Sequence, residues 1–191
     1  AAAAAEKQRS IQSRVDGKPK PGKRAQEESD KPVQAGPRRQ PENPLPAQHL
    51  EKPGNEHELE VAPRFLAPDY RGSGKLRGLA AIVTGGDSGI GRAVAVLFAR
   101  EGADVAIVYL DEHADAKATR RAVEAEGTRC LAIAGDVKDA GFCRKAVART
   151  VKQFGRLDVL VNNAAFQQHV ESLEDITEAQ LQETLDTNIG G

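Results

Sequence analysis

The chain has 191 residues, of which 39% are hydrophobic and 4% aromatic, and its 28 acidic and 27 basic side chains give a formal net charge of −1. This length fits one domain of ordinary size with an appendage. A net charge near zero argues against a general nucleic-acid-binding protein, and no apolar run approaches the roughly 20 residues that span a bilayer. The alanine run 1–5 is too short for the core of a secretion signal, so we expect a cytoplasmic protein with no nucleic-acid or membrane partner.

Residues 1–75 are predicted to form a largely disordered, proline-rich N-terminal extension. All ten prolines lie between Pro19 and Pro68, and the segment carries 14 basic and 11 acidic side chains, a net charge of +3. Branched apolar residues are few, so the segment buries too little apolar surface to offset its ordering entropy. We expect disorder to about residue 60 and packing of residues 60–75 on the folded domain.

Two patterns in the extension have competing interpretations. Its basic residues fit nucleic-acid or membrane contact, but the acids interleaved with them favour a solvated polyampholyte. The spacing Pro41-Glu-Asn-Pro44 is a weak match to a proline-rich interaction motif. The basic residues are Lys18, Lys20, Lys23, Arg24, Arg38 and Arg39.

Residues 76–191 contain no proline and show a regular pattern. Short apolar runs typical of buried strands alternate with stretches of helical periodicity, which end at glycine. The predicted strands are residues 79–84, 105–109, 130–134 and 157–161. The predicted helices are residues 91–100, 114–126 and 140–154, and a last one that the capping-box pattern from Thr177 to Gln180 opens.

This alternation predicts the α/β class. Right-handed crossovers between the strands give a doubly wound parallel sheet of about four strands, with helices on both faces. Ligands of such sheets bind at the carboxyl ends of the strands. We therefore expect one domain over residues 76–191, with its functional residues directly after each strand.

A glycine-rich turn, residues 84–91 (TGGDSGIG), follows the first predicted strand. Glycines permit a tight turn and a close approach of backbone N–H groups to a ligand, and the positive end of the next helix dipole points into the turn. Together they make an anion site suited to a pyrophosphate. A P-loop needs Lys and then Ser or Thr after Gly91, where Arg92 and Ala93 stand, and the GxGxxG pattern needs glycine where Val94 stands.

Four motifs in chain order carry a family resemblance. The turn has the spacing T-G-x-x-x-G-x-G, Gly135-Asp136-Val137 follows the third strand, and Asn162-Asn163-Ala164-Ala165 follows the fourth. Thr187-Asn188-Ile189 lies in the last helix. Residues 72–191 thereby resemble the short-chain dehydrogenase/reductase family, which implies a Rossmann-like fold that binds NAD or NADP.

The extension narrows this resemblance. Pro53-Gly54-x-Glu56 and residues 70–76 (YRGSGKL) look like a subgroup with an N-terminal extension, described as glucose/ribitol dehydrogenase-like or general-stress oxidoreductase-like. The resemblance implies hydride transfer between nicotinamide and the alcohol or carbonyl group of a sugar, polyol or small ketone. Intact members form homotetramers through the helix that starts at Glu178, a state that we consider doubtful for this chain.

The resemblance also implies cofactor-binding roles. The glycines shape the turn, Ser88 and the backbone around it reach the pyrophosphate and ribose, and Asp136 accepts a hydrogen bond from the adenine amino group. A helix N-cap is the alternative role of Asp136, and Asn162 is expected to tie neighbouring strand ends together. Ala165 stands where the family usually has glycine. The expected cofactor-binding residues are Thr84, Gly85, Asp87, Ser88, Gly89, Ile90, Gly91, Tyr109, Asp111, Asp136, Val137, Asn163 and Ala164.

The choice between NAD and NADP stays open from the sequence. An acid at the end of the second strand selects NAD, and an arginine accommodates the NADP phosphate. Tyr109 and Leu110 occupy the deciding positions, with Asp111 next to them, and Ser88 stands where NADP-preferring members carry a basic residue. Asp111 either reaches the ribose or caps the next helix.

The family's catalytic serine and Tyr-x-x-x-Lys have no counterpart in the sequence. Lysine lowers the pKa of the catalytic tyrosine in this family, but Tyr70 and Tyr109 are followed four residues later by Gly74 and His113. Of the catalytic tetrad only Asn188 is matched. We expect a C-terminally truncated oxidoreductase without activity of its own; the alternative is a non-catalytic nucleotide-binding module.

No metal site is expected. Cys130 and Cys143 are 13 residues apart at a strand start and on a helix face, positions typical of buried, unreactive cysteines. The four histidines show no ligand spacing.

Overall fold

The computed structural model describes residues 1–17, 41 and 44–191. One parallel sheet has the strand order β3-β2-β1-β4. Its strands are β1 (Ala80–Thr84), β2 (Asp104–Tyr109), β3 (Cys130–Ala134) and β4 (Val159–Val161). The helices are α1 (Ala2–Asp16), α2 (Gly89–Arg100), α3 (His113–Ala125), α4 (Ala140–Phe154) and α5 (Glu178–Asn188), with two 3-10 turns, η1 (Glu56–Glu58) and η2 (Leu173–Asp175). The predicted α/β fold with a parallel sheet is confirmed.

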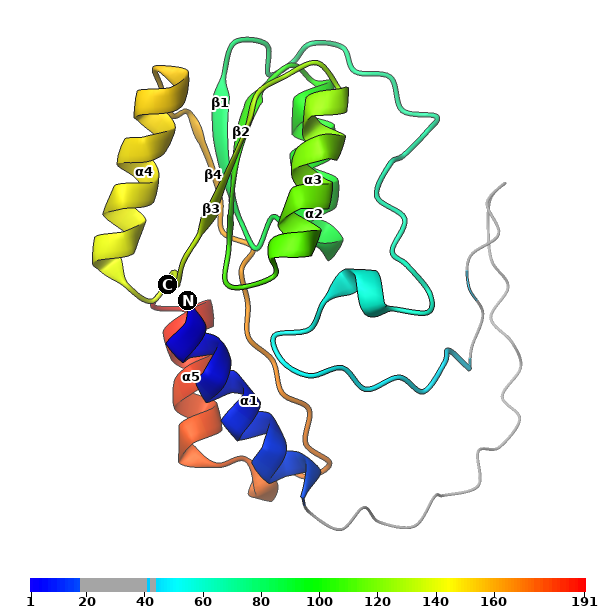
Figure 1. Cartoon of the computed structure of the whole chain (residues 1–191), viewed down its shortest axis with the longest axis vertical. Coiled ribbons are helices and arrows are strands. Elements are labelled where there is room, and N and C mark those ends of the chain that lie inside the picture. Colours follow the sequence, from blue (N-terminus) through cyan, green and yellow to red (C-terminus); the bar gives the residue numbers. More distant parts are fainter. Residues whose placement is uncertain (18–40, 42–43) are drawn as a thin grey trace.

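Different helices cover the two faces of the sheet (Figure 1). Val83, Val105 and Ile107 belong to a core that includes α2 and α3, whereas Ile82 and Ala106 belong to a second core with α4. Successive side chains of a strand point to opposite faces, so both sets are buried. This explains why the strands read as unbroken apolar runs.

The helix ends follow local chemistry. The Asp139 side chain accepts a hydrogen bond from the Gly141 N–H at 2.7 Å, and Gly155, with φ +86°, closes α4 in the left-handed region. At α5, the Thr177 hydroxyl accepts from the Gln180 N–H at 3.2 Å. The other half of the capping box is absent, because the Gln180 amide donates instead to the Gln168 carbonyl at 2.8 Å.

The extension contains an ordered helix where the composition predicted none. Helix α1 packs against α5, and its Lys7 forms an ion pair of 2.6 Å with the buried Glu183 (Figure 1). Alanine has the highest helix propensity, and Ala5 and Ile11 of α1 are buried. Average composition hides this short alanine-rich segment, whose partner lies at the other end of the sequence.

Residues 44–75 contact the domain at particular positions. Phe65 packs against the core that includes α2 and α3, and the Tyr70 hydroxyl donates to Glu101. The basic residues between 18 and 39 and most of the proline spacing at 41–44 lie outside the described residues. Within the described ranges, no helix is both long and apolar enough to cross a bilayer.

Candidate functional site

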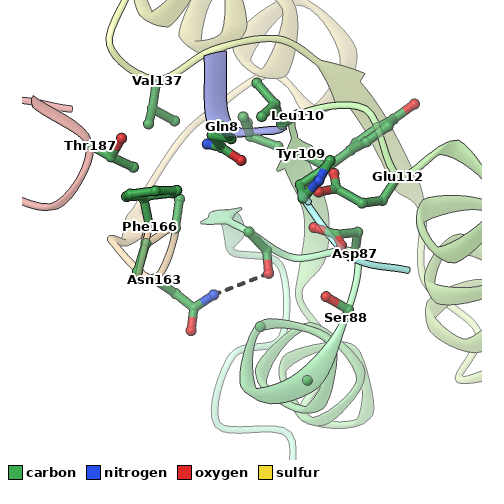
Figure 2. Close-up of a pocket in the computed structure, with 18 of the residues that line it drawn as sticks. Gln8, Asp87, Ser88, Tyr109, Leu110, Glu112, Val137, Asn163, Phe166 and Thr187 are labelled. Carbon is green, nitrogen blue, oxygen red and sulfur yellow. Dashed lines mark hydrogen bonds between the residues drawn. The ribbon is translucent and has the colours of Figure 1, made fainter. Parts of the chain in front are cut away.

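A cavity of about 490 Å³ lies at the carboxyl edge of the sheet. The glycine-rich turn after β1 and the ends of β2, β3 and β4 line it, as the parallel fold predicts. Figure 2 shows Asp87, Ser88, Tyr109 and Glu112 at one end and Phe166 with Thr187 at the other. The lining residues after the strands are Gly85, Asp87, Ser88, Gly89, Ile90, Gly91, Tyr109, Leu110, Glu112, Gly135, Asp136, Val137, Asn163, Ala164, Ala165, Phe166 and Gln167.

Gly85 and Gly91 show why the turn needs glycine. Gly85 has φ +60°, in the left-handed region. A Cβ at Gly91 would lie 2.0 Å from the Gly85 carbonyl oxygen and 2.7 Å from Asn163 Nδ2. Ser88 is the N-cap of α2. The N–H groups of the first helical turn have no acceptor within the helix, and they lie at the positive end of the helix dipole. The turn therefore has the geometry of an anion site.

Asn163 and Thr84 tie the ends of β1 and β4 together. The Thr84 hydroxyl accepts the N–H groups of Asn163 and Ala164, each at 2.9 Å. The Asn163 amide donates to the carbonyls of Thr84 at 2.9 Å and Gly85 at 3.1 Å. The expectation that Asn162 makes this tie is wrong, because the side chain of Asn163 is the one that reaches across to β1.

Two buried acids stand beside the end of β2. Asp87 and Glu112 are 5% and 8% exposed, and both line the cavity. Burial, and next the charge of Glu112, raise the pKa of Asp87 to about 6. Burial and the neighbouring Asp87 also raise the pKa of Tyr109, whose hydroxyl lies 3.0 Å from His113 Nδ1.

Asp111 is not among the residues that line the cavity, although its position predicted a ribose contact. Its carboxylate lies 3.6 Å from His113 Nε2, and Glu112, one residue later, occupies both the cavity wall and the N-cap of α3. Asp111 does not cap α3 either. The chain turns between β2 and α3, so one residue decides which carboxylate faces inward.

Asp136 and Val137 line the cavity after β3. One Asp136 oxygen accepts the Lys138 N–H at 3.0 Å, and the N-cap of α4 is Asp139. The alternative interpretation of Asp136 as an N-cap is therefore wrong.

Asn188 stands beside the cavity without lining it. Its Oδ1 accepts the Phe166 N–H at 2.7 Å, and its Nδ2 donates to the Phe166 carbonyl at 3.1 Å. This double hydrogen bond fixes the backbone of Phe166, which does line the cavity. Thr187 is the neighbouring α5 residue in the cavity wall.

The sequence pattern missed the part of the wall that the extension supplies. Gln8 of α1 and the segment Lys52, Pro53 and Gly54 also line the cavity. Lys52 donates from Nζ to the Gln167 carbonyl at 2.9 Å, and burial lowers its pKa. The resemblance of Pro53-Gly54-x-Glu56 to a subgroup was the one available signal for this contact.

Both cysteines are free, and burial raises the pKa of Cys130 to about 12. Neither thiol faces the cavity. In the part of the chain that the structure describes, no three His, Cys, Asp or Glu side chains gather so as to hold a metal ion.

A family model described as short chain dehydrogenase matches residues 79–191. The chain belongs to this family. General stress protein 39 of Bacillus subtilis is 55% identical over 145 residues, which cover 75% of this chain and 51% of that protein. Glucose and ribitol dehydrogenase of Daucus carota is 41% identical over 150 residues, which cover 75% of this chain and 52% of that protein. The chain thus spans about half the length of these curated relatives, and the predicted family and subgroup are confirmed.

Solved structures of the family carry either cofactor. A short chain dehydrogenase from Burkholderia cenocepacia in complex with NADP is 43% identical, with a TM-score of 0.58 over 61% of this chain and 47% of that one. A short chain dehydrogenase from Mycobacterium paratuberculosis bound to NAD is 35% identical, with the same TM-score and the same shares of the two chains. The fold is that of an NAD(P)-dependent oxidoreductase family, and the prediction of NAD or NADP is confirmed at that level.

Proposed function

We propose that this chain binds NAD or NADP in the cavity at the carboxyl edge of the sheet. We propose that the whole protein transfers hydride between the nicotinamide and an alcohol or carbonyl group of a sugar, polyol or small ketone. The observation that best supports this proposal is the glycine-rich turn, in which a side chain at position 91 would have no room beside Gly85. Family membership and the named activity of the carrot relative support the oxidoreductase class.

The residues present fit such a dinucleotide. The turn from Gly85 to Gly91 offers a helix dipole to the pyrophosphate, together with the N–H groups of Ile90 and Gly91 at the start of α2, while Glu56 accepts the Gly89 N–H. Asp136 and Val137 line the cavity after β3, which supports the proposal that Asp136 accepts a hydrogen bond from the adenine amino group. When bound, the nicotinamide would supply or accept the hydride, and the chain's own residues would bind and orient the dinucleotide.

Asn163 and Asn188 act through other residues in this proposal. Asn163 holds the end of β4 against the turn, and Asn188 fixes the Phe166 backbone in the wall. Both are positioning residues. Thr84 has the same role, because its hydroxyl accepts two N–H groups after β4.

The expected cofactor preference follows from charge. Asp87 and Glu112 place two carboxyl groups beside the end of β2, where a 2′-phosphate would add further negative charge. Among the described lining residues only Lys52 carries a full positive charge, and it contacts Gln167 and Phe166 instead. We therefore expect NADH to bind more tightly than NADPH.

Neither tyrosine supplies the family's acid/base group. Tyr70 donates to Glu101, and Tyr109 contacts His113, with no lysine four residues after either. We propose that the 191-residue chain binds dinucleotide without turnover, as a non-catalytic binding module does. For the whole protein we propose a cytoplasmic location and a homo-oligomer.

Titration of the pure chain with NADH and NADPH, followed by the fluorescence of the reduced nicotinamide, tests the proposal. We expect saturable binding of both cofactors, with NADH binding at least about tenfold more tightly. The 2′-phosphate of NADPH would add negative charge near the two carboxyl groups, and a close like charge shifts an equilibrium by on the order of one pKa unit, which is about tenfold. Gly91→Ala is the negative control, since its Cβ closes the turn. Absence of binding in the folded wild-type chain contradicts the function.

A further inference from the structure

A buried cluster of charged and polar side chains joins the extension to the glycine-rich turn. Glu56, Arg92, Asp115 and Thr119 are each at most 8% exposed. Glu56 comes from η1, Arg92 from α2, and the other two from α3. No residue of this cluster was singled out as a site residue by the sequence.

Glu56 contacts the start of α2 at two points. Its Oε2 accepts the Gly89 N–H at 2.5 Å, and its Oε1 pairs with the Arg92 guanidinium. Gly89 is the first residue of α2 and lines the cavity. The extension thus supplies the acceptor for one of the four N–H groups that a helix start leaves without a partner.

Arg92 transmits the contact to the other side of the turn. Its Nη2 and Nε donate to the Asp87 carbonyl at 2.7 and 3.0 Å, and the Thr119 hydroxyl donates to the same oxygen at 2.6 Å. Its guanidinium also lies 5.0 Å from the centre of the Phe65 ring. The turn between Asp87 and Gly89 is therefore held at both ends by one ion pair.

A second anchor fixes Glu56 itself. Asp115 accepts the N–H groups of Glu56 at 2.6 Å and His57 at 3.2 Å. Lys52, Pro53 and Gly54, which immediately precede η1, form part of the cavity wall. The extension consequently touches the cavity directly and touches its glycine-rich turn through Glu56.

We propose that Glu56 is a positioning residue of the dinucleotide site, so that docking of residues 52–57 and pyrophosphate binding stabilise each other. The inference rests on the proposed function. If docking of residues 52–57 strengthens the binding of a ligand to the turn, binding of that ligand must favour the docked extension by the same coupling free energy. The coupling concerns the pyrophosphate, because Glu56 accepts the Gly89 N–H at the start of α2 directly, whereas the residues proposed to contact the adenine, Asp136 and Val137, follow β3.

The test compares ADP-ribose, which carries the pyrophosphate, with adenosine, which does not. Glu56→Ala is expected to weaken ADP-ribose binding at least tenfold and to leave adenosine binding within twofold, in the full chain at a temperature where circular dichroism shows it folded. Glu56→Gln, which keeps an oxygen for the Gly89 N–H, recovers part of the loss. The matched control is Glu58→Ala, because among the described residues that exposed carboxylate of the same 3-10 turn bonds only the Asn55 side chain.

A merely structural Glu56 gives a different pattern. In that case Glu56→Ala lowers the melting temperature but leaves the ADP-ribose affinity of the folded variant unchanged, or it weakens the binding of both ligands equally. Either result overturns the proposal. If Glu56→Ala does not fold, amide hydrogen exchange in the wild type decides. ADP-ribose is expected to slow exchange of the Glu56 and His57 amides at least threefold, and no change there overturns the coupling. Failure of the wild type to bind ADP-ribose at all contradicts the proposed function itself.

Discussion

At the scale of single residues, Asp87 shows how the fold changes a side chain's chemistry. The sequence places it in a turn, where aspartate is ordinarily exposed and ionised. The structure buries it beside Glu112, and burial first and that charge second raise its pKa from 3.8 to about 6. A carboxyl group that titrates near neutral pH at the cavity wall links ligand binding and stability to pH.

Asp87→Asn tests this shift through the pH dependence of stability. Between pH 4 and 6 the folded state keeps the Asp87 proton while the unfolded state loses it, so the free energy of unfolding falls as pH rises. A shift of about 2 pKa units corresponds to about 3 kcal/mol at most. The variant, measured by urea unfolding at each pH, is expected to gain stability relative to wild type across this window. A difference that is the same at pH 4 and pH 7 contradicts the assignment.

At the scale of elements, the contact between η1 and α2 depends on a buried ion pair. Arg92 neutralises Glu56 and lies 3.7 Å from an Asp115 oxygen, inside a cluster that water barely reaches. Removing one partner of such a cluster leaves charge buried without compensation. The same feature that positions the turn therefore stabilises the docking of the extension.

Arg92→Ala is expected to lower the free energy of unfolding by about 3–5 kcal/mol, because two carboxylates lose their buried counter-charge. Arg120→Ala is the matched control. Its ion pair with Glu124 at 2.8 Å on α3 is exposed, and its loss costs about 0.5 kcal/mol or less. Urea denaturation of both variants measures the difference. Equal effects of the two substitutions would show that the cluster contributes no more than a surface pair.

At the scale of the whole molecule, β4 and α5 expose apolar side chains among the described residues. β4 is an edge strand of the sheet, and its Leu160 is 59% exposed. Leu181, Leu185 and Ile189 of α5 and its C-terminal end are exposed as well. A strand edge without a neighbouring strand and exposed apolar side chains each favour association between chains.

The 191-residue chain is therefore expected to self-associate at micromolar concentrations. Leu160→Lys places a charge on the edge strand and is expected to lower the average mass in light scattering toward that of one chain. Leu66→Lys is the control, since Leu66 is similarly exposed, at 53%, but belongs to the extension and to no strand of the sheet. A monodisperse wild-type monomer, or an equal effect of both substitutions, contradicts this prediction.

The sequence alone determined the order and type of the strands and α-helices from β1 to α5, and the position of the glycine-rich turn between β1 and α2. These features depend on periodicity, glycine punctuation and capping, which act within one element. Predicted bounds agree within about two residues; α2 begins at Gly89 and β4 at Val159. The residues after the strands consequently fall around one cavity.

Only the tertiary structure decided which side chains meet. Asn163, and not Asn162, makes the tie to β1, and Glu112, and not Asp111, lines the cavity. Neighbouring side chains of an extended backbone point in opposite directions, so a shift of one residue changes which side chain faces inward. The tertiary structure also brought Glu56 to Gly89, 33 residues later, and α1 to α5. Local pattern carries no information on contacts between distant segments, since these depend on packing and on the pairing of buried charges.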